Sequence, residues 1–351
     1  MNRRVTIEDV AREAGVSRQT VSRAINNKGE ISPTTRNRVM EAVRALDYRP
    51  SRLARGLATW LTRTVGLVVP DITNPFFPEI ARGVQDVARG EDYSVFLCNT
   101  DESPGEELQI LHSLAAQPVD GIILFGSRIS DSELVAFADG YRPLVTLNRY
   151  LTHPGVSLIL VNNQRGAELA VDHLVDQGHT AIGMLAGPIT SPSSTQRVQG
   201  FRQAMAARGL PSPEDWISAG PPTIEGGYDA AQRLLMRHPQ LTALFAYNDL
   251  SALGAAQACR ELKRRVPGDC DIVGFDDVRL AAMVSPALTT IRVNKYFLGQ
   301  QAMTRLLEML DQPDEGFSPI HVDVELVVRE STQERKLEIG DSRNELPISN
   351  L

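Results

Sequence analysis

From Thr64 onward the sequence alternates short apolar runs with stretches of helical periodicity, and this rhythm constrains the fold more than any other feature. The runs VGLVVP, YSVFLCN, GIILF and PLVTLN are predicted strands, and the segments between them are predicted helices. After SLILVNN the rhythm resumes with the strands AIGMLAG, TALFAY and DIVGF and with predicted helices around residues 167–176, 196–208, 227–237 and 250–264. Repeated strand and helix indicates parallel sheets covered by helices. Two such series predict an α/β fold with two doubly wound sheets.

Polar and aromatic side chains follow many of these predicted strands. Ligands of doubly wound folds bind beyond the carboxyl ends of the strands, so two facing lobes predict a cleft between them. Carboxylates, amides and arginine bind hydroxyl groups, and aromatic faces cover the apolar side of a sugar ring. A hydroxyl-rich ligand is therefore expected. In the alternative reading, Asn248 or Asp276 only caps a helix and Phe77 only fills the core. The strand-end residues are Asp71, Asn74 to Phe77, Asn148, Arg149, Ser191, Ser193, Arg197, Asn248, Asp249 and Asp276.

The charge of the chain is unevenly distributed. Residues 1–63 carry 13 basic and 6 acidic side chains, whereas the other 288 residues carry 23 and 37, and the whole chain has a formal net charge of -7. A basic segment on an acidic body predicts that only the N-terminal segment approaches a polyanion. A solvated arginine-rich surface gives the same count, so the pattern of residues has to decide.

The first 48 residues have the pattern of three short helices. Thr6 and Asp9 form a capping-box-like start for a helix over residues 7–14, and Gly15 allows the left-handed conformation that ends it. Ser17 can cap a second helix that runs to about residue 26, and Ser32 can cap a third. Arginine and glutamine on the outer face of the second helix suit guanine and adenine in the major groove. The pattern predicts a helix-turn-helix head that binds DNA. The polar residues of that outer face are Arg18, Gln19, Ser22, Arg23 and Asn26.

The segments VTIEDVAREAGVSRQTVSRAINN and RPSRLARGLAT, with residues 32–48 between them, resemble the DNA-binding head of the lactose and galactose repressor family. The resemblance continues along nearly the whole chain. It implies a transcriptional repressor that binds a near-palindromic double-stranded operator as a homodimer. The base-reading residues that it implies are Arg18, Gln19 and Arg23. The backbone phosphate contacts that it implies are Ser17, Thr20, Ser22, Asn26 and Thr35.

Residues 51–62 join the head, residues 1–50, to the body, and the resemblance implies a hinge that becomes helical only on the operator. The segment is too short for a stable isolated helix, and Gly56 weakens it further. Arg55 and Leu57 fall on the family's minor-groove positions, where an inserted leucine parts a base step and kinks the duplex. The alternative is a flexible linker whose leucine packs on the body.

The body, residues 63–331, resembles a periplasmic sugar-binding protein. The resemblance implies that the chain crosses between two lobes near Asn162, Arg292 and His321. Lobe 1 is then about residues 63–162 and 293–321, and lobe 2 about residues 163–292 and 322–331. A sugar or sugar derivative is the implied effector. The residues on the family's effector positions are Phe76, Phe77, Asn148, Ser193, Arg197, Asn248 and Asp276.

Three departures from the family pattern widen the choice of ligand. Asn148 replaces a common aspartate, Pro222 stands where an aromatic side chain often stacks on the effector, and Val293 replaces a polar residue. With Arg149 and Arg197 nearby, a sugar acid or sugar phosphate fits as well as a neutral sugar, and a purine stays open. The departures also leave open a DNA-binding regulator of the same fold without an effector response.

Other classes of protein lack support in the sequence. GxSxG, P-loop and HExxH motifs are absent, so we expect no catalytic activity and no cofactor. Cys98, Cys259 and Cys270 form no C-x-x-C pair, so we expect buried thiols and no metal site. The N-terminus has no apolar signal core and no run of about 18 apolar residues occurs, which predicts a cytoplasmic protein without membrane contact. Residues 332–351 carry no leucine heptad, which predicts a flexible tail and a dimer instead of a tetramer.

Overall fold

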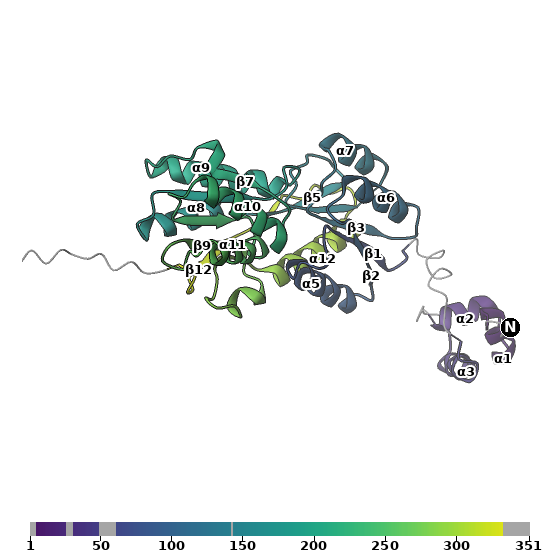
Figure 1. The fold of residues 1–351 in the computed structure, drawn as a ribbon. Coiled ribbons are helices and arrows are strands. Elements are labelled where there is room, and N and C mark those ends of the chain that lie inside the picture. Colours follow the sequence, from purple (N-terminus) through teal and green to yellow (C-terminus); the bar gives the residue numbers. More distant parts are fainter. Residues whose placement is uncertain (1–4, 26–30, 49–60, 142, 333–351) are drawn as a thin grey trace, which may run out of the picture. The chain divides into compact units, whose positions relative to one another are not determined.

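The structure is a computed structural model that describes residues 5–25, 31–48, 61–141 and 143–332 (Figure 1). It divides into two units, Met1–Arg63 and Thr64–Leu351. The predicted DNA contacts Asn26, Arg55 and Leu57 lie outside the described residues, as does the tail from residue 333 onward. Among the described residues, no helix is both long and apolar enough to span a bilayer.

The N-terminal unit contains three short helices, α1 (Ile7–Ala14), α2 (Arg18–Ile25) and α3 (Pro33–Ala45). The predicted capping box is present at Thr6 and Asp9, and Gly15 ends α1 with a φ of 61°. One valine of each helix, Val10, Val21 and Val39, is fully buried in a common core. The predicted helix-turn-helix head is therefore confirmed.

Lobe 1 of the body is a six-stranded parallel sheet with strands in the order β11-β5-β4-β3-β1-β2. Helices α5 (Phe76–Gly90) and α12 (Lys295–Asp311) cover one face, while α6 (Pro104–Ala115) and α7 (Asp131–Gly140) cover the other. Successive residues of β1 point to opposite cores, since Leu67 packs with α5 and Val68 with α6. The strands are β1 (Thr64–Val69), β2 (Ser94–Asn99), β3 (Gly121–Phe125), β4 (Leu144–Leu147), β5 (Val156–Val161) and β11 (Ile320–Val322).

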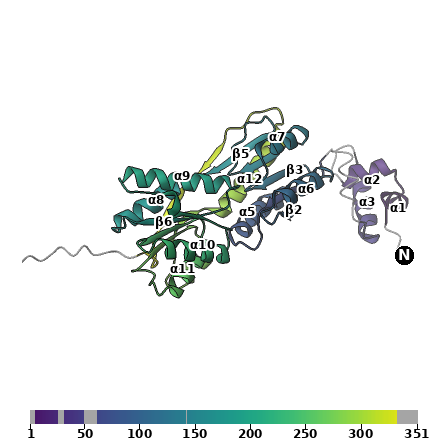
Figure 2. The ribbon, with the colours of Figure 1, turned by 45° about the horizontal axis from the view of Figure 1, so that its top comes forward.

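Lobe 2 repeats this architecture with strands in the order β12-β10-β9-β8-β6-β7, and only β12 runs antiparallel to its neighbour. Helices α8 (Asn163–Asp176) and α9 (Pro192–Ala207) cover one face, and α10 (Ile224–Arg237) and α11 (Asp249–Glu261) the other (Figure 2). Short 3-10 turns are η1 (Glu214–Trp216) and η2 (Arg279–Ala282). The strands are β6 (Ile182–Ala186), β7 (Ile217–Ala219), β8 (Ala243–Ala246), β9 (Asp271–Asp276), β10 (Thr289–Val293) and β12 (Val324–Val327). Both lobes have the predicted doubly wound α/β fold.

The chain passes between the two sheets three times. It leaves lobe 1 after β5 for α8, returns after β10 to form α12, and leaves again between β11 and β12. On its return it packs α12 closely against α5, because a Cβ added at Gly83 or Gly299 would overlap the backbone of the facing helix. These crossings bring the carboxyl ends of parallel strands from both sheets to a common region.

Candidate functional site

The proposed base-reading side chains lie on α2 of the head. Arg18, Gln19 and Arg23 are exposed, whereas Val21 and Ala24 of the same helix are buried. Ser17 acts as a local cap, because its Oγ accepts a hydrogen bond from the Thr20 backbone nitrogen at 3.1 Å. The separation of polar and apolar residues leaves one face of α2 available for a partner.

The proposed phosphate contacts surround this helix. Thr20 and Ser22 are half-buried on α2, and Ser17 precedes it. Thr35 is half-buried in the first turn of α3, where its hydroxyl and backbone nitrogen contact the Ser32 hydroxyl at 2.9 and 3.2 Å. Both serines therefore satisfy backbone nitrogens at the helix N-termini.

The body has an open cavity of about 890 Å³ between the lobes. Asp71, Thr73, Asp101 and Glu102 line it from the loops after β1 and β2 of lobe 1. Residues of lobe 2 face them from the loops after β6 and β7: Pro188, Ile189, Ala219, Gly220, Pro221, Pro222 and Thr223. The cavity thus lies where doubly wound folds bind ligands, with carboxylates on one side and mainly apolar groups on the other.

Arg197 contacts residues at the ends of β5, β8 and β9 and does not itself line this cavity. It lies in the second turn of α9, because that helix begins at Pro192 and not near residue 196 as the sequence pattern suggested. Its Nε donates to Asn163 Oδ1 at 2.9 Å, and a terminal nitrogen donates to the Tyr247 carbonyl. The guanidinium lies 3.5 Å from the Phe275 ring centroid. Only 4% of the residue is exposed, so this charge is held by protein groups.

Asp276 is the buried acidic partner of Arg197. Its Oδ1 lies 3.6 Å from an Arg197 terminal nitrogen, and it ends β9 instead of capping a helix. Burial raises the pKa of the Asp276 carboxyl to about 6, although the charges of Arg197 and Lys295 lower it. A carboxyl of this kind accepts or donates hydrogen bonds near neutral pH, depending on its protonation.

The two proposed asparagine contacts both have structural roles. Asn148, with φ of 57°, accepts a hydrogen bond from the Val161 backbone nitrogen at 2.8 Å. Asn248 caps α11 by accepting from the Ser251 nitrogen at 2.8 Å, so the alternative reading as a cap is correct for its oxygen. Its Nδ2 donates to the Pro222 carbonyl at 3.0 Å and so fixes a loop that lines the cavity.

The remaining proposed effector contacts begin two helices. Phe76 and Phe77 start α5 with their rings edge to face, 5.2 Å between centroids. Ser193 is buried in the first turn of α9. Arg149 points elsewhere, because its guanidinium donates to the Ile129 carbonyl and pairs with Asp131, both at 2.7 Å.

Sequence reasoning missed the residues that hold these contacts in place. Asn163 and Tyr247 bind the Arg197 guanidinium, Phe275 lies under it, and Lys295 donates to the carbonyl of Asp276. Asn163 and Tyr247 had a usable signal, since each is the last residue of a predicted strand run. Lys295 had no such signal in the sequence, because lysine at a helix start normally indicates a solvated surface.

A helical head with an exposed polar face and a two-lobed body with a strand-end cavity define a DNA-binding regulator with a ligand-binding domain. Comparison with known families agrees. Residues 6–51 match the model for "Bacterial regulatory proteins, lacI family", and residues 62–330 match "Periplasmic binding proteins and sugar binding domain of LacI family". The chain belongs to the LacI family, and it is a transcriptional repressor of that family.

Curated relatives cover almost the full chain. The HTH-type transcriptional repressor PurR of Mannheimia succiniciproducens is 37% identical and covers 93% of this chain and 98% of its own. Catabolite control protein A of Priestia megaterium is 34% identical over 94% of this chain and 99% of its own. The ribose operon repressor of Halalkalibacterium halodurans is 36% identical over 93% and 97%. These relatives are repressors and regulators, not enzymes.

Solved structures match at similar coverage. The lac repressor dimer bound to operator and the anti-inducer ONPF has a TM-score of 0.84 at 30% identity, covering 94% of this chain and 99% of that one. The complex of the transcriptional regulator CelR with cellobiose has a TM-score of 0.72 at 32% identity, covering 93% and 100%.

Proposed function

We propose that this repressor binds a near-palindromic operator as a homodimer and that a small ligand in the inter-lobe cavity sets its operator affinity. The observation that carries the ligand part is the cavity lined by strand-end loops of both lobes, and the buried pair of Arg197 and Asp276 lies at strand ends of lobe 2. A ligand that contacts both walls binds best at one separation of the lobes, so binding shifts the balance between lobe arrangements. A sugar is favoured because related regulators have been solved with cellobiose and with ribose.

In this proposal α2 enters the major groove, where Arg18, Gln19 and Arg23 read bases. Ser17, Thr20, Ser22 and Thr35 bind phosphates around it, with Asn26 at the end of the same segment. Arg55 and Leu57 act in the minor groove, and their assignment, like that of Asn26, rests on the family resemblance alone. Because the target is chromosomal DNA, the proposed location is the cytoplasm, and no catalytic role is assigned.

The charges around the cavity favour an uncharged ligand over a sugar acid or phosphate. Asp71, Asp101 and Glu102 line the cavity, and no cationic side chain lines it among the residues that the structure describes. The nearby arginines are already paired. Arg128 bonds Glu102 at 2.6 Å, and Arg149 and Arg197 have the partners given above. An anion would meet carboxylates at the entrance without a cation to bind it.

The effector contacts proposed from the family resemblance are Phe76, Phe77, Asn148, Ser193, Arg197, Asn248 and Asp276. None of them lines the cavity of about 890 Å³, and Asn248 is joined to it by its hydrogen bond to the Pro222 carbonyl. The second candidate is a regulator of the same fold without an effector response. Internal hydrogen bonding of Arg197 and Asn248 favours it, because both side chains are satisfied without a ligand. Pro222, in place of a stacking aromatic residue, favours it too.

Thermal denaturation with a matched panel separates these candidates. The panel contains ribose, glucose and cellobiose, each beside a phosphorylated or acidic counterpart. A ligand at about 100 times its dissociation constant stabilises the native state by about 2.7 kcal/mol. We expect at least one neutral sugar to raise the melting temperature and its charged counterpart to leave it unchanged. A larger rise with a charged member contradicts the assigned ligand class, and no rise with any member supports the second candidate.

A further inference from the structure

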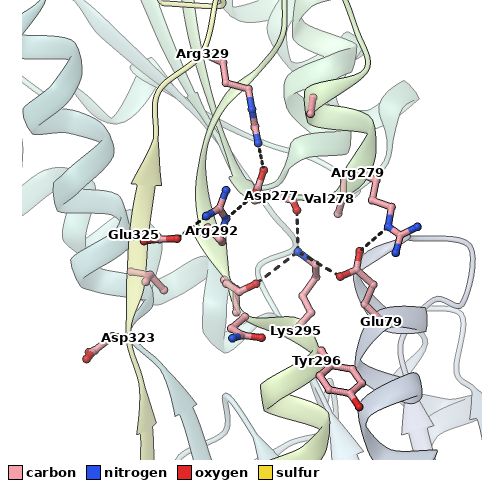
Figure 3. Close-up of a pocket in the computed structure, with 14 residues that line it drawn as sticks. Glu79, Asp277, Val278, Arg279, Arg292, Lys295, Tyr296, Asp323, Glu325 and Arg329 are labelled. Atoms are coloured by element: carbon pink, nitrogen blue, oxygen red, sulfur yellow. Dashed lines mark hydrogen bonds and ion pairs between the residues drawn. The ribbon is translucent and has the colours of Figure 1, made fainter. Parts of the chain in front are cut away.

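Lys295 is a buried cation in an unfavourable position. It is the first residue of α12, only 4% exposed, and lines a second cavity of about 750 Å³ (Figure 3). A helix N-terminus carries partial positive charge, and burial removes the water that would stabilise the ammonium. A lysine is retained at such a place only if its partners compensate both costs.

The partners of the ammonium come from two lobes. Nζ donates to the carbonyls of Asp276 and Asp277 at 2.7 and 2.8 Å, where β9 ends and the following turn of lobe 2 begins, and to the Val293 carbonyl at 3.5 Å. Its contact with Glu79 Oε2 is 3.9 Å long, and Glu79 lies in the first turn of α5 in lobe 1. Figure 3 shows Lys295 between Asp277 and Glu79.

The turn that Lys295 holds is strained. Asp276 and Asp277 have φ values of 109° and 51°, a region that side-chain-bearing residues adopt at a cost. A second hydrogen bond holds the next residue, Val278, because its backbone nitrogen donates to the buried carboxylate of Asp249 at 2.7 Å. The turn is therefore fixed from both sides by groups outside its own strand.

Asp276 contacts two different residues, one through its side-chain carboxylate and one through its backbone carbonyl. Its carboxylate lies beside Arg197, while its carbonyl accepts from Lys295. On the far side of Lys295, Glu79 lies three residues after Phe76 in the first turn of α5, and α5 packs directly on α12. A path of contacts therefore joins the Arg197–Asp276 pair to the helix pair of lobe 1.

We propose that Lys295 is a positioning residue that holds the Asp276–Asp277 turn in place and ties it to α5 through Glu79. The link between Lys295 and effector control rests on the proposed function, in which Asp276 contacts the ligand. A ligand that moves Asp276 then also moves the start of α5.

Amide hydrogen exchange on the intact protein tests this role without effector or operator. Glu79→Gln removes the lobe 1 end of the path, and a half-exposed residue is the site least able to disturb folding. Because Glu79 also lies 4.0 Å from Arg279, Arg279→Gln is measured beside it, and equal acceleration in Arg279→Gln would assign the effect to Arg279 and overturn the role of Lys295. We expect exchange at least about threefold faster in peptides covering residues 274–283 of lobe 2, although the substitution is in lobe 1. Lys295→Met should accelerate exchange in those peptides and in the first turns of α5.

Arg292→Met is the matched control from the same cavity. Arg292 pairs with Asp277 at 2.6 Å and Glu325 at 2.7 Å, both in lobe 2, so its loss should leave the exchange of α5 unchanged. Unchanged exchange at residues 274–283 in Glu79→Gln overturns the proposal, as does equal acceleration of α5 in Arg292→Met. Because neither sugar nor DNA is present, this result is separate from the outcome of the denaturation panel.

Discussion

Replacing Arg197 with methionine is the most informative single change in the body. The side chains of Arg197 and Asp276 are 5% and 7% exposed, so the substitution leaves a buried carboxyl without its nearest cation. Breaking a buried pair in this way typically costs about 3–5 kcal/mol. Methionine keeps much of the contact with the Phe275 ring, which restricts the change to charge and hydrogen bonds. The loss should therefore lower the free energy of unfolding as well as ligand affinity.

The pH dependence of that loss identifies its cause. In the wild type the Asp276 pKa is raised from 3.8 to about 6, so its ionisation costs the native state about 3 kcal/mol at pH 7. The stability contributed by the protonated group is present below the unfolded pKa and is lost as pH rises through about 6. Without Arg197 the folded pKa rises further, because the charge of Arg197 lowers it. The variant's deficit should then be about 1–3 kcal/mol larger at pH 8 than at pH 5, where Asp276 is protonated in both proteins.

Urea unfolding followed by circular dichroism at both pH values measures this difference. Lys295, Asp249 and Asp277 also lie near Asp276, but they are present in both proteins and cancel in the comparison. Arg202→Met is the control, since Arg202 is on the same helix and pairs with the exposed Glu214, so its effect should stay within about 0.5 kcal/mol. A deficit for Arg197→Met that is equal at pH 5 and pH 8 refutes the assigned interaction with Asp276.

Three further predictions concern DNA binding and assembly. Arg23→Ala should weaken specific operator binding by about 1–3 kcal/mol and leave binding to random duplex nearly unchanged; equal losses would indicate a backbone contact. Leu57→Ala should reduce operator affinity and bending together, measured by energy transfer between labelled DNA ends, and an unchanged bend would make the segment a linker only. The full-length chain and a chain without the tail should both sediment with the mass of a dimer. A tetramer formed only by the full-length chain would contradict the prediction. Thr332 is buried and bonds His173 at 2.8 Å, so this truncation is made after Thr332.

The repeating features of the fold were predictable from local sequence. The capping box at Thr6 and the strand-helix rhythm after Thr64 each arise from short-range spacing, and both appear in the structure. The start of α9 was placed about four residues late, because the apolar spacing begins inside the helix while its true start is the Ser191 cap followed by Pro192. The antiparallel strand β12 was not predicted, since its four residues follow a crossing that carries no local signal.

The site was less predictable than the fold. Strand-end position led to Arg197 and Asp276, but it did not reveal that they pair with each other. Their contact depends on how β9 and α9 meet, and these elements are more than 60 residues apart in the sequence. The same limit explains why Lys295 was missed and why Arg149 was taken for a ligand contact although its side chain points to α7.

Linkage between ligand binding and operator binding tests most directly whether the inter-lobe cavity controls DNA binding. Operator affinity is measured by fluorescence anisotropy while the sugar that raises the melting temperature is titrated, and sugar affinity is measured with and without operator. Saturating sugar should change operator affinity by about 5- to 150-fold, and operator should change sugar affinity by the same factor. A sugar that stabilises the protein but leaves operator affinity unchanged contradicts the claim that the inter-lobe cavity controls DNA binding.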